Sequence, residues 1–226
     1  MNKMHNKTII VVWEGVDGAG KTTLLNKTSN ILNSMNFKVL KYKTPSNTPS
    51  GVFARKYGNR PEVDHLTRML LFLANTSDDS ALMKKEIEKE KPDYYFIDRY
   101  YVCSIVYGLA LSKARGGEVG EEELKQFIEF VEKVGLKVFI NPDLYVIVDV
   151  GEEDRKRRLE VKEGQGGIEE EIEKSTEIQD QVRRFYEYFY HLRPHQTIWV
   201  ENAEGELEKN TKMIIEKLLE FKKLRE

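Results

Sequence analysis

The chain has few of the residues that build disulfides, zinc sites and membrane spans. Its 226 residues include one cysteine, Cys103, which cannot form an internal disulfide, and no cluster of cysteine and histidine has the spacing of a zinc site. No segment approaches the roughly 20 consecutive apolar residues that a membrane helix needs. The first residues also lack the small-residue cleavage site of a signal peptide. These absences predict a protein of the reducing cytoplasm with no structural zinc and no membrane partner.

The chain also lacks an excess of charge of one sign. Lys+Arg 36 and Asp+Glu 38 give a formal net charge of -2. Proteins that bind DNA or RNA usually carry a strongly basic face, so no nucleic acid partner is expected. Hydrophobic residues at 40% and charged residues at 33% are typical of a globular protein. A chain of this length fits one domain, here residues 1–226.

Five short runs of β-branched and aromatic residues predict the buried strands of a parallel sheet. They alternate with amphipathic segments, so right-handed crossovers should place helices on both faces of the sheet. The predicted fold class is therefore α/β, with three layers and a five-stranded parallel sheet flanked by helices. The predicted strands are 8–13, 37–42, 94–97, 144–148 and 197–200, and the predicted helices are 21–35, 62–91 as one or two helices, about 100–114, 121–133, 152–161, 169–190 and 207–224, with a loop around Pro45, Pro49 and Gly51.

The segment after the first predicted strand matches a phosphate-binding loop. WEGVDGAGKTT, residues 13–23, separates Gly15 from Gly20 by four residues and continues with Lys21 and Thr22 into a predicted helix. Glycines let successive backbone N–H groups turn toward a phosphate, and the start of the helix adds a positive field. Lys21 should neutralise phosphate oxygens, and Thr22 should place its hydroxyl on Mg²⁺. The motif predicts a P-loop NTPase fold that binds ATP through Gly15, Val16, Asp17, Gly18, Ala19, Gly20, Lys21, Thr22 and Thr23.

A phosphate-binding loop alone is shared by kinases, GTPases and ATP-driven motors. A GTPase would carry Asn-Lys-x-Asp after a late strand, and the only Asn-Lys pairs followed by Thr, at Asn6 and Asn26, are in the wrong places. Asp98 and Arg99 follow the third predicted strand, and parallel sheets bind ligands at the carboxyl ends of their strands. Asp98 can hold a Mg²⁺-bound water, and Arg99 can pair bidentately with the phosphate of an acceptor. The pair favours a kinase, with a structural ion pair as the alternative.

Four segments together resemble the thymidylate kinase family: residues 13–23, TPSNTPSGVFAR at 44–55, LLFLANT at 70–76 and FIDRYYVCSIVYG at 96–108. The resemblance covers most of the chain. It implies ATP-dependent phosphorylation of a nucleoside monophosphate, foremost dTMP to dTDP, with Mg²⁺ as cofactor, nucleotides as small-molecule partners and a homodimer as the assembly. A kinase for dUMP or for a nucleoside, and an ATP-binding regulatory protein without transfer activity, stay open as alternatives.

The resemblance also implies where the acceptor binds. Asp17 would accept a hydrogen bond from the sugar hydroxyl, and Phe72 would stack on the base, although a loop cap and ordinary core packing are the respective alternatives. Thr76 stands where the family has an arginine that reads the base edge, so the accepted base is left open. Ser46 and Asn47 replace a double glycine in the acceptor loop. The implied acceptor residues are Asp17, Pro45, Arg55, Phe72, Arg99, Ser104 and Tyr107.

Phosphoryl transfer needs positive charge around the moving group beyond that of the loop lysine. Residues 148–164 resemble the family's late strand and arginine-bearing helix, and their arginines are 155, 157 and 158. We expect Arg158 to serve the transition state, with Lys162 in reserve, and a solvated helix face for at least one arginine of the run. Glycines at 164–167 predict a mobile lid at about 160–172. The predicted catalytic residues are Lys21, Arg99 and Arg158, and the predicted metal ligands are Thr22 and Asp98.

Overall fold

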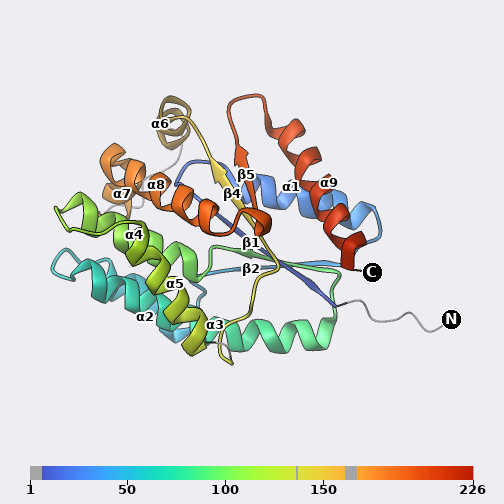
Figure 1. Cartoon of the computed structure of the whole chain (residues 1–226), viewed down its shortest axis with the longest axis horizontal. Helices are drawn as coiled ribbons and strands as arrows, with labels where there is room; N and C mark the ends of the chain where they lie inside the picture. The colour runs from blue at the N-terminus through green and yellow to red at the C-terminus, as the bar shows by residue number, and fades with distance from the viewer. Residues whose placement is uncertain (1–6, 136, 161–166, 226) are drawn as a thin grey trace.

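A parallel sheet of five strands forms the centre of the computed structural model, which describes residues 7–135, 137–160 and 167–225 (Figure 1). The strand order is β2-β3-β1-β4-β5, and every neighbouring pair is parallel. All five predicted strands are confirmed to within two residues at each end. The strands are β1 (Ile9–Gly15), β2 (Val39–Lys43), β3 (Tyr94–Asp98), β4 (Leu144–Asp149) and β5 (Thr197–Glu201).

Helices cover both faces of the sheet, which confirms the predicted three-layer α/β class (Figure 1). α1 (Lys21–Ser34) and α9 (Leu207–Arg225) pack together on one face. α4 (Tyr101–Ala114) and α8 (Thr176–Leu192) pack together on the other, and α3 (His65–Glu90) lies against α4. Because β1 is covered on both sides, all seven of its residues are buried, as its nearly unbroken apolar sequence predicts.

Two expectations about the helices were wrong. The segment expected to be a loop around Pro49 and Gly51 forms a helix, α2 (Pro49–Gly58), because Thr48 caps it and proline is well suited to a first helical turn. The single helix expected at 169–190 is two helices, α7 (Gly167–Lys174) and α8, and the Ser175 hydroxyl between them caps α8. The remaining elements are α5 (Glu121–Gly135), α6 (Glu152–Glu160) and a short 3-10 helix, η1 (Pro194–Gln196).

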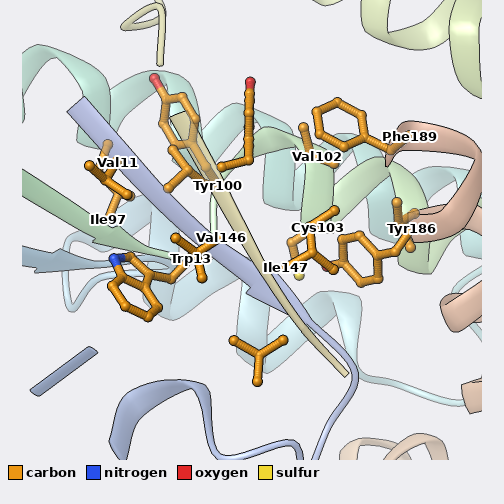
Figure 2. Close-up of a cluster of buried hydrophobic side chains, with 14 of the residues drawn as sticks. Val11, Trp13, Ile97, Tyr100, Val102, Cys103, Val146, Ile147, Tyr186 and Phe189 are labelled. Atoms are coloured by element: carbon orange, nitrogen blue, oxygen red, sulfur yellow. The ribbon is translucent and has the colours of Figure 1, made fainter. Parts of the chain in front are cut away.

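The core lies between the sheet and the helices that cover it. Figure 2 shows part of it, with Trp13 from β1, Tyr100 and Cys103 from the start of α4, and Tyr186 from α8 among the buried side chains. Burial of large apolar and aromatic side chains on this scale is the main favourable contribution to folding. Tyr100, Cys103 and Tyr186 therefore help fix how α4 and α8 sit on one face of the sheet, while Trp13 packs against Phe96 on the other face.

The strand register brings the predicted site segments to one edge of the sheet. Trp13 of β1 is paired with Asp98 of β3, and Gly15 is paired with Val148 of β4. Residues 161–166 of the predicted lid at 160–172, which include Lys162 and Gly164, lie outside the described residues. None of the helices in the described ranges is long and apolar enough to cross a bilayer.

Candidate functional site

The loop between β1 and α1 can exist only because glycine occupies its turning points. Gly15 has φ 133°, and a Cβ there would lie 1.9 Å from the carbonyl oxygen of Val148, so only glycine lets β1 pass this close to β4. Gly20 has φ 83° and precedes α1 without a side-chain cap. The first N–H groups of α1 thus have no capping side chain, which is the arrangement that suits an anion.

Lys21 is buried and directed at the loop that precedes it. Its Nζ donates hydrogen bonds to the carbonyl oxygens of Gly15 at 2.9 Å and Val16 at 2.7 Å. Burial lowers the pKa of Lys21 to about 8, against the opposing effect of the carboxylates of Asp17 and Asp98. An anion beside Lys21 would favour its charged form, so the lysine is suited to bind phosphate oxygens.

Thr22 and Asp98 meet beside the loop. The Thr22 hydroxyl donates a hydrogen bond to Oδ2 of Asp98 at 2.9 Å, and the Thr22 side chain is at the exposed start of α1. Among the described residues no group of three or more histidine, cysteine or acidic side chains could hold a metal alone. Mg²⁺ in nucleotide sites is commonly held by one or two protein groups, waters and substrate phosphates, so a hydroxyl and a carboxylate in contact fit this ion.

Asp17 and Arg99 form a buried ion pair between the loop and β3. Arg99 NH2 contacts Oδ1 of Asp17, and Oδ2 of Asp17 accepts hydrogen bonds from the Tyr107 hydroxyl at 2.7 Å and from Gln179 Nε2 at 3.3 Å. Burial alone would raise the pKa of Asp17, but the charges of Arg99 and Lys21 hold it well below its usual value. Asp17 therefore stays charged throughout the neutral range.

Arg99 has an unusual backbone conformation. Its φ of 68° lies in the left-handed region, which is uncommon for a residue other than glycine. Its N–H donates to the carbonyl oxygen of Trp13 at 3.0 Å, and its own carbonyl oxygen accepts from the Thr44 hydroxyl at 2.9 Å. The Arg99 side chain keeps 22% of its surface exposed, so the guanidinium can still meet a ligand.

The acceptor loop, residues 44–48, is held by its own neighbours. Arg55 NH1 donates to the carbonyl oxygens of Pro45 at 2.7 Å and Ser46 at 2.8 Å, and NH2 donates to the Asn47 side chain at 2.9 Å. From α3, the buried carboxylate of Asp79 accepts from the backbone N–H and the hydroxyl of Ser46. Arg55 therefore holds this loop in place through three hydrogen bonds.

The side chains around Phe72 include a cation, although Thr76 stands where the family has an arginine that reads the base. Thr76 is only 2% exposed, and its hydroxyl donates to the carbonyl oxygen of Phe72 at 2.9 Å, so it is directed into its own helix. The guanidinium of Arg68 lies over the Phe72 ring, 4.7 Å from the centroid. The positive charge near Phe72 therefore comes from one turn earlier in α3.

The three arginines of α6 have three different surroundings. Arg158 NH1 lies 3.2 Å from the carbonyl oxygen of Ala19 and 3.4 Å from that of Gly18, and NH2 donates to the carbonyl oxygen of Asn202 at 2.7 Å. Arg155 is completely buried and paired with Glu152, and Arg157 is exposed and paired with acidic side chains. Of the three, the hydrogen bonds place Arg158 on the phosphate loop.

The structure joins most of the predicted site residues but not all of them. Lys21, Thr22, Asp98, Asp17, Arg99, Tyr107 and Arg158 are linked through the loop by the contacts above, and Pro45 and Arg55 are linked to Arg99 through Thr44. In the described part of the chain, no hydrogen bond or ring contact joins Phe72 or Ser104 to Asp17 or Arg99. Their proposed roles rest on their helices being neighbours of this region.

Three polar residues at this site are not among those that the sequence predicts. Glu14 is buried between α4 and α8, Gln179 Oε1 accepts from the N–H of Asp17 at 3.0 Å, and Asn202 Nδ2 donates to the carbonyl oxygen of Ala19 at 2.7 Å. Gln179 and Asn202 belong to segments far from the loop in sequence and match no local motif. Glu14 had a signal that could have been used, because it is the one charged residue within the apolar first strand.

Comparison with known proteins places the whole arrangement in context. Residues 13–214 match the family model described as Thymidylate kinase. The chain is 28% identical over 211 residues to a probable thymidylate kinase of Thermococcus gammatolerans, which covers 88% of this chain and 90% of the relative. It is 27% identical over 217 residues to the thymidylate kinase of Desulfotalea psychrophila, which covers 93% of this chain and 98% of the relative.

Solved structures show the same fold. The thymidylate kinase of Ehrlichia chaffeensis superposes with a TM-score of 0.64 at 18% identity, covering 94% of this chain and 99% of that one. The thymidylate kinase of Candida albicans superposes with a TM-score of 0.66 at 20% identity, covering 97% and 94%. The predicted P-loop NTPase fold is thereby confirmed, as is the resemblance on which the acceptor site was predicted.

Proposed function

Because the chain belongs to the thymidylate kinase family, we propose that it transfers the γ-phosphoryl group of ATP to the 5′-phosphate of dTMP and so forms dTDP. Membership of the family makes it a phosphotransferase that binds nucleotides. One observation carries the proposal in this chain, the contact between Arg99 and Asp17. It puts a fixed guanidinium directly beside the loop that suits the donor phosphates, where a second phosphate has to be received.

On the donor side, the loop from Gly15 to Thr23 holds ATP. Its N–H groups and the start of α1 bind the phosphate oxygens, and Lys21 exchanges its two carbonyl contacts for those oxygens. Thr22 and Asp98, which are in contact, would hold Mg²⁺. When bound, the ion neutralises charge on the phosphate oxygens.

On the acceptor side, Arg99 binds the phosphate of dTMP and leaves Asp17 as a hydrogen-bond acceptor for the sugar. Tyr107 orients Asp17 through its hydroxyl, and Ser104 belongs to the same helix. Phe72 stacks on the base, and Arg55 holds the loop containing Pro45 in place beside the acceptor. Positioning and charge of this kind account for most of the acceleration in phosphoryl transfer.

Arg158 supplies the further positive charge at the transferring group. It reaches the phosphate loop through Gly18 and Ala19, whereas Arg155 is committed to Glu152 and Arg157 is committed to the surface. A cation that contacts the loop before substrate arrives needs only a small movement to meet the γ-phosphate. The electrostatic effect of such a group is large in a site from which water is excluded.

We also propose that the protein is a homodimer through α2 and α3. In the described ranges these two helices carry six of the eleven exposed large hydrophobic side chains: Val52, Phe53, Tyr57, Leu66, Leu70 and Leu82. The rings of Phe53 and Tyr57 stack at 5.4 Å between centroids. Exposed apolar side chains gathered on two packed helices are typical of a surface that a second chain covers.

Coupled release of ADP tests the reaction directly. Turnover is measured with ATP and each of dTMP, dUMP and thymidine, and we expect dTMP to give the highest kcat/KM. Faster turnover of dUMP or thymidine would show that this compound, and not dTMP, is the preferred acceptor, and the protein would still be a kinase. Tight ATP binding without turnover of any acceptor would show instead a binding protein that has lost transfer.

A further inference from the structure

Glu14 is a completely buried carboxylate that none of the proposed binding roles uses. Its Oε1 accepts hydrogen bonds from the N–H groups of Tyr100 at 2.9 Å and Cys103 at 3.2 Å, and its Oε2 accepts from the Tyr186 hydroxyl at 3.0 Å. Burying a charge is costly unless hydrogen bonds satisfy it, so these three bonds account for its presence in the core. They join β1 to α4 and α8, where Figure 2 shows Cys103 and Tyr186 close together.

Glu14 caps a helix that its own sequence leaves uncapped. The first N–H groups of an α-helix have no partner within the helix. Tyr100, the residue before α4, makes no side-chain cap. Glu14, 86 positions earlier in the chain, accepts from Tyr100 itself and from the third residue of the helix. A carboxylate at this end of a helix is also favoured by the helix dipole.

Arg99 directly precedes this cap, in its left-handed conformation. Such a conformation persists only where the surroundings hold it. The Arg99 N–H is held by Trp13 and its carbonyl oxygen is held by Thr44. The following peptide N–H, that of Tyr100, is held by Glu14. Removing the carboxylate would release one of the three bonds around the residue and leave two buried N–H groups without a partner.

We propose that Glu14 is a positioning residue for Arg99, holding the first turn of α4 so that the guanidinium stays directed at Asp17 and at the acceptor phosphate. The inference rests on the proposed function only in naming that phosphate as the ligand of Arg99. Glu14 touches neither substrate, and its effect passes through the backbone of residues 99–103. Tyr186 extends the same support to α8, the helix whose Gln179 contacts Asp17.

The strength of this support depends on the charge of Glu14. The ionisable groups that face it are Arg99 and Cys103 from the α4 side, Tyr186 from α8 and Tyr145 from β4. Burial raises the pKa of Glu14 to about 7, against the opposing charge of Arg99 and the hydrogen bonds it accepts. A charged carboxylate accepts stronger hydrogen bonds than a neutral acid, so the support strengthens as the pH rises through neutrality.

Steady-state kinetics with Glu14→Ala and Glu14→Gln test the inference, with Glu132→Gln as the matched control. Glu132, on α5, accepts hydrogen bonds from the Tyr101 hydroxyl at the start of α4 and from Arg193, and among the described residues no hydrogen bond joins it to the backbone of residues 99–103. We expect Glu14→Ala to lower kcat/KM for dTMP about 100-fold, because a small misplacement of a positioning group has an effect of this size. The Kd for ATP should change less than about threefold in every variant. Equal losses for ATP and dTMP would overturn the inference.

Two further measurements keep the inference testable if Glu14→Ala does not fold. Glutamine keeps an oxygen for both N–H groups but carries no charge, so the ratio of wild-type to Glu14→Gln kcat/KM should rise about tenfold between pH 6 and pH 8.5. Ionisation of dTMP cancels in this ratio, and a flat ratio would contradict the role. Hydrogen exchange at the Tyr100 and Cys103 amides needs no turnover, so it decides the inference even if the wild-type protein phosphorylates nothing. Exchange in Glu14→Gln at least tenfold faster than in Glu132→Gln supports the cap, and equal rates overturn it.

Discussion

The positive charge of Arg99 lies near two acidic side chains, Asp17 and Glu14, whose pKa values are shifted in opposite directions. Asp17 touches the guanidinium, and although burial opposes it, the charges of Arg99 and Lys21 keep the pKa of Asp17 far below neutrality. Glu14 is bonded to the neighbouring backbone, and there burial outweighs Arg99 and raises the pKa to about 7. One carboxylate is therefore always available as an acceptor, while the other changes its charge within the physiological range.

Replacing Arg99 should separate the two substrates. We expect Arg99→Ala to lower kcat/KM for dTMP by roughly 100- to 1,000-fold, because a charged donor to the acceptor phosphate is lost. The Kd for an ATP analogue should stay within about threefold of wild type in a titration. Arg157→Ala, which removes a guanidinium from the exposed face of α6, is the control and should match wild type. If Arg99→Ala weakened ATP binding as much as it lowered kcat/KM for dTMP, the acceptor role would be contradicted.

Replacing Glu14 should change how stability depends on pH. A pKa raised from 4.5 in the unfolded chain to about 7 in the folded protein stabilises the fold below pH 4.5, and this contribution is lost as the pH rises to about 7. The loss amounts to roughly 3 kcal/mol, which Glu14→Gln does not suffer. Thermal unfolding should therefore show the Tm of Glu14→Gln rising relative to wild type, by about 5 to 10 °C between pH 5 and pH 8. A constant difference in Tm would show that Glu14 does not titrate in this range.

At the scale of elements, the start of α2 can be tested apart from catalysis. The Thr48 hydroxyl accepts from the N–H of Gly51 at 3.3 Å and is hydrogen-bonded to the Asn75 side-chain amide at 3.1 Å, and so it caps α2 and ties it to α3. Thr48→Ala should lower the free energy of unfolding by about 1 kcal/mol in a denaturant titration, which is the usual effect of losing an N-cap. Thr48→Ser keeps the hydroxyl and should lie within about 0.5 kcal/mol of wild type. A loss of equal size in both variants would point to the methyl group instead.

The strands could be predicted from the sequence because burial on both faces leaves little room for polar residues in them. α2 could not, because Pro49 and Gly51 are signals for a turn as well as for the beginning of a helix. In the folded chain the hydroxyl of Thr48 favours the helix through its contact with Asn75 on α3, and the local sequence does not reveal this contact. Ser175 divides the helix expected at 169–190 into two in the same way. Its hydroxyl caps α8 at a point where the amphipathic pattern of the sequence continues without a break.

In the candidate site, too, the residues of a local motif could be predicted from the sequence and the residues that come from distant segments could not. The phosphate loop is a continuous motif, so its residues and their geometry follow from spacing alone. Glu14, Gln179 and Asn202 act across 86, 162 and 183 positions respectively, and no local pattern can pair residues at such separations. The family resemblance favours Arg158 among three neighbouring arginines, and only the packing of α6 against the loop distinguishes its surroundings from those of Arg155.

At the scale of the whole molecule, the proposed dimer makes a direct prediction about mass. Phe53 on α2 is 55% exposed, and Phe130 on α5 is 60% exposed. Phe53→Glu should convert a particle of two chains to one chain in light scattering at micromolar concentration, because a charge at the centre of an apolar interface is left without a partner. Phe130→Glu adds the same charge to another helix and should leave the mass unchanged. A wild-type protein that is already a single chain would contradict the assembly.

The carbonyl groups of the phosphate loop depend on the last part of the chain. Asn202 donates to Ala19, and Arg158 links the two. During synthesis the loop leaves the ribosome 183 residues before Asn202 does. A nascent chain therefore carries the complete motif long before it has the supports that shape it, and bound nucleotide cannot guide the early stages of folding. Under the proposed function the donor site is complete only when β5 joins the edge of the sheet, so we expect a protein shortened before this strand to keep its signature sequence and lose ATP binding.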